Sequence, residues 1–239
     1  MTKVNVHAGL KGRILIIEDE AQIRKFLRIS LVAHGFAIAE ARLGEDGLAV
    51  CAAEPPDLVI LDLGLPDIDG LELISRLRDW STVPIIVLSV RSDEAEKVQA
   101  LDRGANDYVT KPFGISELMA RIRALLRSRT TPVRDEAAFR FDDLEIDLSR
   151  RKVKVAGCDV HLSRKEYKLL RLLATHAGQV LTHQQILREV WGPAHATDTH
   201  YLRVLIGHLR QKLGDEPSRP RYIVTEQGVG YRLIESKSG

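Results

Sequence analysis

The residues of this chain that could carry chemistry are polar side chains that each follow a short apolar run. They are Glu18 and Asp19 after 13–17, Asp62 after 58–61, Ser89 after 84–88 and Lys111 after 107–110. Apolar runs of this kind are typical of parallel strands buried on both faces. Ligands of open α/β sheets bind beyond the carboxyl ends of such strands, so these side chains are placed for chemistry. Asp62 is the first candidate for a reactive group, and capping the next turn is its alternative role.

The types of these side chains predict a site for a metal ion and a phosphoryl group. Carboxylates that lie close together repel each other unless a cation lies between them, and an oxygen-only cluster suits hydrated Mg²⁺. Lys111 and the Ser89 hydroxyl supply donors for an anion, so a phosphoryl group could be held on Asp62 during in-line transfer. Taken singly, each residue has a plain alternative: a helix cap for Glu18 or Asp19, a turn for Ser89, a solvated charge for Lys111. Four such coincidences at four strand ends favour the phosphoryl site.

The elements that position these residues alternate between strands and helices. Strands are predicted at 13–17, 37–41, 58–61, 84–89 and 107–110. A first helix is predicted after Glu20 and ends before Gly35, and further helices are predicted at 44–53, 71–77, 94–102 and 116–127. On the first helix, Ile23, Phe26, Leu27 and Leu31 are expected on one buried face. This alternation predicts an α/β doubly wound, five-stranded parallel sheet over residues 12–128.

The 239 residues suit two ordinary domains. The net charge is −2 over residues 1–129 and +4 over 130–239, so a polyanion partner is indicated for the second half. Cys51 and Cys158 are too few and too far apart for a disulfide framework or a metal cluster, which fits a reducing cytoplasm. No apolar run approaches the ~18 residues of a membrane span, so no membrane insertion is expected. Residues 1–11 lack the apolar core of a signal peptide and are predicted to be a loose extension.

The second half is predicted to be an α+β winged-helix domain. Residues 129–138 are polar with one proline and indicate a linker, and residues 236–239 are a tail. Short strands at 139–141, 144–148, 152–155 and 160–162 predict a small antiparallel sheet. Helices follow from the capping box at Ser163, from Thr182 and over 199–213. A glycine-bearing hairpin with strands at 222–225 and 231–234 completes domain 139–235.

The third of these helices is the candidate nucleic-acid reader. Its outer face is expected to carry donors that suit a major groove, His200, Tyr201, Arg203, His208, Arg210, Gln211 and Lys212. Base reading is assigned to His200, Tyr201, Arg203 and His208, and phosphate contacts to Arg210, Lys212 and Arg232. The alternative is an ordinary solvated helix face.

Residues 12–128 resemble the receiver domain of bacterial two-component response regulators. The matching residues are Glu18-Asp19, Asp62, Pro66, Gly70, Ser89 and Lys111-Pro112-Phe113. The resemblance implies that Asp62 accepts phosphate from a sensor histidine kinase. It also implies that Asp19, Asp62 and the Gly64 carbonyl bind Mg²⁺ directly, with Glu18 acting through water. Ser89 and Tyr108 match the family's switch pair, and Lys111-Pro112 matches its cis peptide.

Residues 139–235 resemble the output domain of the OmpR/PhoB class, which ends in Gly-Tyr-Arg, here Gly230-Tyr231-Arg232. The resemblance implies a cytoplasmic transcriptional regulator that dimerises on phosphorylation, binds two operator half-sites in double-stranded DNA and has RNA polymerase as a further partner. It assigns Lys97, Asp107, Glu117 and Arg121 to ion pairs across the dimer face, with Asp107 to Arg121 and Lys97 to Glu117 as couples. The runs 200–203 and 207–213 resemble members that control potassium-uptake genes.

Two positions depart from the common pattern. Val90 stands where a smaller residue is usual and could hinder access to Asp62, and Asn106 replaces an Asp, which would remove one charge from the dimer face. Two other functions compete with the regulator. An aspartyl-phosphate hydrolase or phosphotransferase is disfavoured because no second Asp follows two residues after Asp62. A DNA-binding protein independent of phosphorylation is disfavoured because every acceptor-site residue is present. No enzymatic activity is expected beyond self-phosphorylation from small donors and autodephosphorylation.

Overall fold

The computed structural model describes residues 11–90, 93–130, 138–195 and 198–234. It divides into two compact units, Met1–Leu126 and Arg127–Gly239, each with its own hydrophobic core. The predicted extension up to residue 10, the linker from 131 to 137 and the tail at 236–239 lie outside the described residues.

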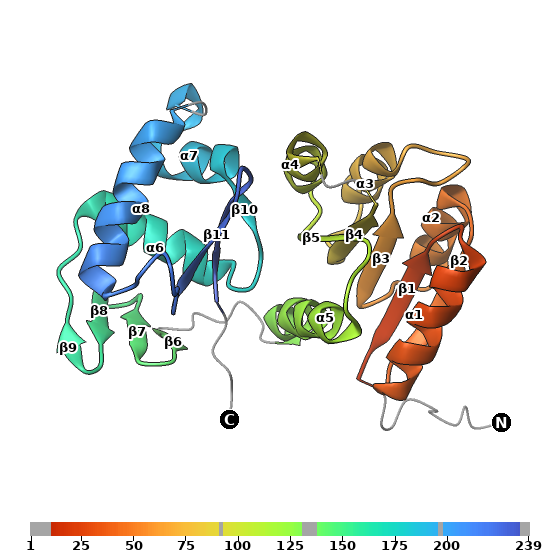
Figure 1. Ribbon diagram of the computed structural model, residues 1–239, viewed down its shortest axis with the longest axis horizontal. Helices are drawn as coiled ribbons and strands as arrows, with labels where there is room; N and C mark the ends of the chain where they lie inside the picture. Colours follow the sequence, from red (N-terminus) through yellow and green to blue (C-terminus); the bar gives the residue numbers. More distant parts are fainter. Residues whose placement is uncertain (1–10, 91–92, 131–137, 196–197, 235–239) are drawn as a thin grey trace. The chain divides into compact units, whose positions relative to one another are not determined.

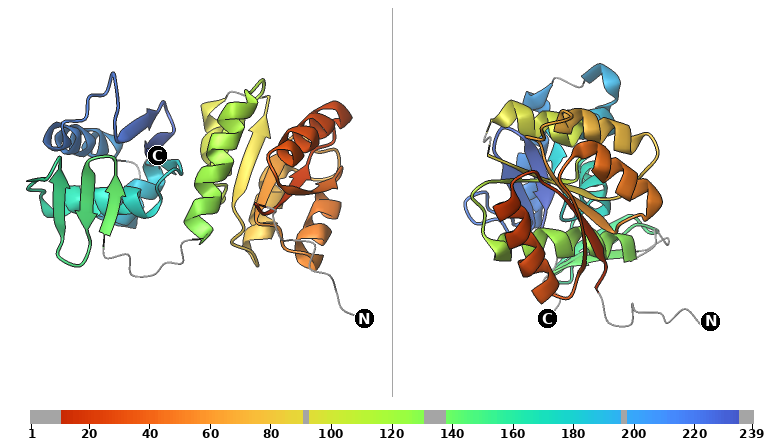
Figure 2. Two further views of the ribbon diagram at one scale, coloured as in Figure 1. Left: turned by 90° about the horizontal axis from the view of Figure 1, so that it is seen from below. Right: turned by 90° about the vertical axis from the view of Figure 1, so that its right-hand side faces the viewer.

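The first unit is a parallel five-stranded sheet between two layers of helices, as the right-hand view of Figure 2 shows. The strands have the order β2-β1-β3-β4-β5. Their bounds are β1 Arg13–Ile17, β2 Ala37–Ala41, β3 Leu58–Asp62, β4 Ile85–Ser89 and β5 Asp107–Thr110. The helices are α1 Ala21–Ala33, α2 Gly44–Ala53, α3 Gly70–Arg78, α4 Glu94–Asp102 and α5 Ile115–Thr130. Helices α1 and α5 cover one face of the sheet, and α2, α3 and α4 cover the other (Figure 1).

The predicted doubly wound fold is confirmed, and most element bounds agree with the pattern. Every side chain of β3 and β4 is buried, as expected of central parallel strands. Two details differ. Phe26 is 46% exposed on α1 while Leu27 and Leu31 fill the core, because the predicted apolar stripe is wider than the face that the sheet covers. Helix α5 runs on to Thr130, past the predicted end at residue 127.

The second unit packs three helices between two small antiparallel sheets (Figure 1). One sheet has the order β6-β7-β8-β9 and the other the order β10-β12-β11. The strands are β6 Ala138–Phe141, β7 Leu144–Asp147, β8 Lys152–Val155, β9 Cys158–Asp159, β10 Leu181–Thr182, β11 Ile223–Glu226 and β12 Gly230–Leu233. The helices are α6 Arg164–Thr175, α7 His183–Trp191 and α8 Thr199–Leu213, with a short 3₁₀ turn η1 at Pro193–His195.

The winged-helix prediction is confirmed, with both helix starts capped as the sequence indicates. Ser163 with Glu166 forms a complete capping box on α6, and Thr182 with Gln185 forms a second one on α7. The predicted strand at 160–162 is wrong. The chain reverses in a two-residue turn at Ala156 and Gly157, so Val155 pairs with Cys158 and the return strand is already over at Asp159. The strand β10, which pairs with β12, was not predicted.

Candidate functional site

The carboxyl ends of β1 and β3 bring three acidic side chains together. Glu18 and Asp19 follow β1, and Asp62 is the last residue of β3. One carboxylate oxygen from each of them lies within 4.8 Å of the other two. The parallel register aligns the two strands, pairing Ile17 with Leu61, so the acids meet at one edge of the sheet. This convergence was predicted from the strand ends and is confirmed.

Lys111, just after β5, supplies a cation that two of these acids share. Its Nζ lies 2.8 Å from Glu18 Oε2 and 3.2 Å from Asp62 Oδ1. Burial acts to lower the pKa of Lys111, but the hydrogen bond to Glu18 and the charges of Asp62 and Glu18 raise it overall. Burial is also the main effect on Glu18. It raises the pKa of that carboxyl, and the charge of Asp62 adds to it against the opposing contacts of Lys111.

The cluster has the donor set of a site for a hard divalent cation. Three carboxylates offer only oxygen ligands, and Asp19 and Asp62 line an open cavity of about 800 Å³ together with Gly64, Ser89 and Lys111. The cavity leaves room for the water molecules that Mg²⁺ retains in proteins. These residues therefore fit Mg²⁺, and hydroxyl and ammonium donors stand beside it for an anion.

The two residues that the resemblance assigns to a switch pair lie on this edge of the sheet or next to it. Ser89 is buried at the end of β4, and the peptide bond between Lys111 and Pro112 is cis, as the resemblance implied. The Tyr108 ring is buried on β5 with its hydroxyl 3.2 Å from Glu96 Oε2. Val90 is 69% exposed and lines the same cavity as Asp62.

Arg24 is part of the site's framework that the sequence reasoning missed. Its Nη1 donates to the backbone carbonyl oxygens of Glu18 at 2.6 Å and Asp19 at 3.1 Å. The guanidinium thereby holds the turn that carries both acids. A basic residue in the first turn of the helix after an acidic run was the signal available.

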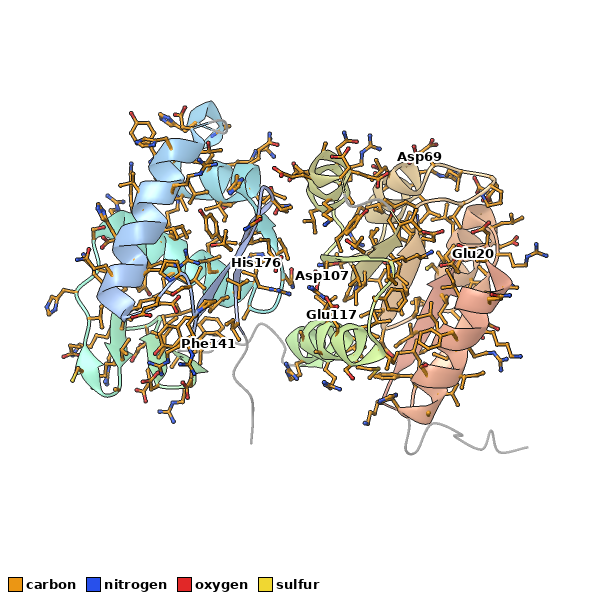
Figure 3. All side chains as sticks on the ribbon, viewed as in Figure 1. Glu20, Asp69, Asp107, Glu117, Phe141 and His176 are labelled. Carbon is orange, nitrogen blue, oxygen red and sulfur yellow. The ribbon has the colours of Figure 1, made fainter. Side chains whose placement is uncertain are left out.

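The residues assigned to the dimer face make contacts within the chain. Arg121 Nη1 lies 2.9 and 2.8 Å from the two carboxylate oxygens of Asp107, and its Nη2 lies 2.8 Å from Glu117 Oε1. Figure 3 shows Asp107 and Glu117 close together on β5 and α5. Lys97 Nζ lies 5.6 Å from the centroid of the Tyr108 ring. The couple Asp107 to Arg121, predicted between two copies, is thus formed inside one chain.

Asn106 has a structural role that differs from the predicted effect on the dimer face. Its Oδ1 accepts from Arg78 Nη2 at 3.1 Å and from the Ile85 amide at 2.9 Å. Arg78 also donates to the carbonyls of Ser81 and Gly104. These three acceptors are neutral, and burial lowers the pKa of Arg78 to about 10.

The outer face of α8 carries most of the predicted DNA-reading side chains. His200, Tyr201, Arg203 and His208 are exposed, and Tyr201 is 61% exposed. Val204, which the sequence reasoning placed nowhere, is 43% exposed among them. The face is therefore available to a partner.

Among the residues assigned to phosphate contacts, Arg210 does not lie on the exposed face of α8, contrary to the prediction from the sequence. It is 7% exposed, and its Nη2 donates to the Ile223 carbonyl at 2.6 Å and to Thr225 Oγ1 at 2.9 Å. Both acceptors lie on β11, so this side chain ties α8 to that strand. Lys212 is exposed but paired with Glu166 at 2.7 Å, and Arg232 pairs with Glu226 across the hairpin.

In the described part of the chain, no helix is long and apolar enough to cross a membrane.

Comparison with known proteins agrees with this arrangement in both units. Residues 14–123 match the response regulator receiver domain, and residues 157–233 match the C-terminal domain of transcriptional regulatory proteins. The chain is 49% identical over 221 residues to the KDP operon transcriptional regulatory protein KdpE of Escherichia coli, and the alignment covers 92% of this chain and 98% of the relative. It is 48% identical to the transcriptional regulatory protein KdpE of Mycobacterium tuberculosis H37Rv, with the same coverage. The response regulator MprA of Mycolicibacterium vanbaalenii is 42% identical, covering 94% of this chain and 98% of the relative.

The two matched domains occur in the order that the fold shows, and relatives at this identity span nearly the whole chain. The winged-helix unit makes it a DNA-binding transcriptional regulator, and the receiver unit implies a sensor kinase as its partner. The chain belongs to the response regulators of the OmpR/PhoB class.

Proposed function

We propose that phosphorylation of Asp62 by a sensor histidine kinase switches this regulator to its DNA-binding dimer. The observation that carries the proposal is the position of Asp62, with Lys111 Nζ at 3.2 Å and two further carboxylates within 4.8 Å. Asp62 both lines the open cavity and lies within ion-pair distance of Lys111. In the transfer, the phosphorus–nitrogen bond of a phosphohistidine breaks as a bond from Asp62 to phosphorus forms.

The chain's own residues prepare Asp62 for this reaction. Glu18, Asp19, Asp62 and the Gly64 carbonyl would hold Mg²⁺, which when bound offsets the negative charge of the incoming phosphoryl oxygens. Lys111 is held beside Asp62 by Glu18 and donates to the same oxygens. The Ser89 hydroxyl supplies a further donor, and Tyr108 changes its packing on α4 as Ser89 turns. We propose no enzymatic activity beyond self-phosphorylation and autodephosphorylation, because Gly64 stands where a hydrolase would carry a general acid.

Labelling with acetyl phosphate tests this assignment. The wild type should be labelled in the presence of Mg²⁺, and Asp62→Asn should not. Asp57→Asn is a matched control, since Asp57 accepts a bond from the Arg13 amide at the opposite end of β3. Equal labelling of Asp62→Asn and the wild type would contradict the proposal.

We further propose that α8 reads DNA in the major groove as one of two copies in a dimer. Two winged helices on one side of the duplex require half-sites about one helical turn apart. His200, Tyr201, Arg203 and His208 would contact base edges, and the exposed Val204 suits a thymine methyl group. Lys212 and Arg232 would hold phosphates by exchanging their present acidic partners for DNA. Arg210 is left out of this set because it is buried against β11.

Salt-dependent binding separates base readers from phosphate contacts. Arg203→Ala should cost ~1–3 kcal/mol on operator DNA and little on scrambled DNA. Lys212→Ala should weaken both and reduce the salt slope by about one unit. Equal losses for both variants on both DNAs would contradict the assignment of Arg203.

We propose that the phosphorylated dimer forms through α4, β5 and α5. Arg121 would exchange Asp107 of its own chain for Asp107 of the second copy, and Lys97 would pair with Glu117. The more exposed pair of Lys97 with Glu117 would contribute only ~0–1 kcal/mol and would set the register of the dimer, whereas Asp107 is buried in the single chain. Arg121→Glu should weaken the phosphorylated dimer in sedimentation, whereas an unchanged profile would count against this face.

The genes we propose as targets are those for potassium uptake, with RNA polymerase as the partner at the promoter in the cytoplasm. The support is the identity of 48–49% to two regulators named KdpE, against 42% to MprA. Binding of the purified protein to the promoter upstream of potassium-uptake genes, against an unrelated promoter, tests the target.

A further inference from the structure

The loop that follows Asp62 is attached to a helix that takes no part in the site. Residues 63–69 connect β3 to α3 and include Gly64, whose carbonyl belongs to the proposed metal set. Asp67, in this loop, accepts hydrogen bonds from the amides of Gly44 at 2.9 Å and Glu45 at 3.0 Å. These are the first two amides of α2, and the helix's own N-cap residue, Leu43, contributes no side-chain hydrogen bond. The cap of α2 is therefore supplied by a residue more than twenty positions away.

Packing at the same point is an independent sign of a built contact. A Cβ atom on Gly44 would lie 2.2 Å from Ile68 Cγ2, 2.7 Å from Leu73 Cδ1 and 3.2 Å from Leu65 Cδ1. Only glycine at this position allows the loop side chains to approach the start of α2 so closely. The loop is thus attached to α2 by the hydrogen bonds of Asp67 and by close apolar packing at Gly44.

The far end of the loop is also held. Asp69 caps α3 through the Leu71 amide at 2.7 Å, and a Cβ on Gly70 would lie 2.6 Å from Leu63 Cα. Between Asp62 in the sheet and Asp69 at the N-cap of α3, the contacts of Asp67 and of Gly44 attach the loop to α2. The loop's backbone position, and with it the direction of the Gly64 carbonyl, depends on those contacts.

We propose that Asp67 is a positioning residue for the metal site, which it serves by fixing the β3–α3 loop on the N-terminus of α2. This inference rests on the proposed function, in which the Gly64 carbonyl binds Mg²⁺. A carbonyl held in place before the metal arrives costs no ordering on binding, so loss of the attachment should weaken Mg²⁺. Asp67 touches neither metal nor phosphate and acts only through the loop.

Magnesium titration of the full-length protein, followed by the amide NMR signals of Asp62 and Gly64, tests the proposal without a phosphodonor. Asp67→Ala and Gly44→Ala disturb the two sides of the contact by different means, and each should raise the dissociation constant for Mg²⁺ about 3–10-fold. The dissociation constant of Asp67→Asn should lie between those of these two variants and that of the wild type, because its amide oxygen still accepts hydrogen bonds. The control Glu45→Gln weakens the exposed pair with Arg76 at the same helix end and should leave the affinity within about twofold.

Hydrogen exchange in metal-free protein gives the second readout. Amides of residues 63–69 should exchange faster in Asp67→Ala and Gly44→Ala and remain as in the wild type in Glu45→Gln. A purely local role in capping α2 would speed exchange in α2 and leave the Mg²⁺ affinity unchanged.

The outcomes separate this inference from the function on which it rests. Unchanged Mg²⁺ affinity in Asp67→Ala, with normal labelling of Asp62, overturns the positioning role and leaves the proposed function standing. A weakened affinity in Asp67→Ala, in a protein whose wild type is not labelled at all, supports the positioning role and contradicts the phosphorylation.

Discussion

Removing the charge of Lys111 should destabilise the first unit by an amount that depends steeply on pH. Lys111→Met keeps most of the apolar stem but leaves Glu18 and Asp62 without the cation between them. The side chains of Glu18, Asp62 and Lys111 are only 1%, 10% and 7% exposed, so solvent screens the change weakly. Breaking such a buried pair typically costs about 3–5 kcal/mol.

Protonation of Glu18 limits this cost. Protonating Glu18 costs about 1.36 kcal/mol for each unit by which the pH exceeds its ordinary pKa of 4.5. The cost is therefore about 4 kcal/mol at about pH 7.5 and about 1.4 kcal/mol at about pH 5.5. The free energy of unfolding should therefore fall by about 3–4 kcal/mol at the higher pH and by about 1.4 kcal/mol at the lower one. The loss of stability is larger at the higher pH because burial raises the folded-state pKa of Glu18 above its unfolded value. Its contribution to stability is complete below the unfolded pKa and is lost as pH rises through the folded pKa.

Urea unfolding at both pH values, read by hydrogen exchange in β1 and β3, measures the effect on this unit alone. Lys25→Met, which removes an exposed lysine from α1, is the matched control and should change little. Mg²⁺ should restore part of the lost stability at the higher pH, since it binds the folded state. An equal loss at both pH values would refute the reasoning, because it would show that the carboxylates are not coupled through Lys111.

Three further substitutions test features outside the Asp62 site. Asn106→Asp gives the half-buried Arg78 a charged acceptor and should raise the free energy of unfolding by about 1 kcal/mol above about pH 4. This gain should be lost at lower pH as the new carboxylate protonates, and urea unfolding that shows no gain at neutral pH would contradict the prediction. Ala156 has a φ of 50°, so Ala156→Asn should stabilise the second unit by about 0.5–1 kcal/mol in thermal unfolding, while a lower midpoint would show that the turn is not strained. Arg210→Met should lower the free energy of unfolding of the second unit by about 1–3 kcal/mol. DNA binding by the folded variant should keep the same dependence on salt as the wild type, and a shallower dependence would show that Arg210 contacts phosphate.

Local pattern was sufficient for most of the elements and for bringing the residues of the candidate site to one edge of the sheet. Apolar runs specify buried parallel strands, and the edge of a parallel sheet brings together whatever follows each run, so Glu18, Asp62 and Lys111 could be placed side by side from spacing alone. The capping box at Ser163 was equally readable, because both of its hydrogen bonds join residues three positions apart. The assignment of roles to individual receiver residues also drew on the family resemblance.

Contacts between elements distant in sequence were decided only by the tertiary structure. Helical periodicity places Arg210 at the border between the apolar and the polar face of α8, and the packing of β11 on that border buries it. Periodicity likewise cannot tell that the guanidinium of Arg121 reaches Asp107 of its own chain. Nor does it show that Asp67 caps a helix that begins at Gly44. The physical reason is the same in each case: a pattern along the chain defines the faces of one element, whereas the partner of a polar side chain depends on which other element comes to lie against that face.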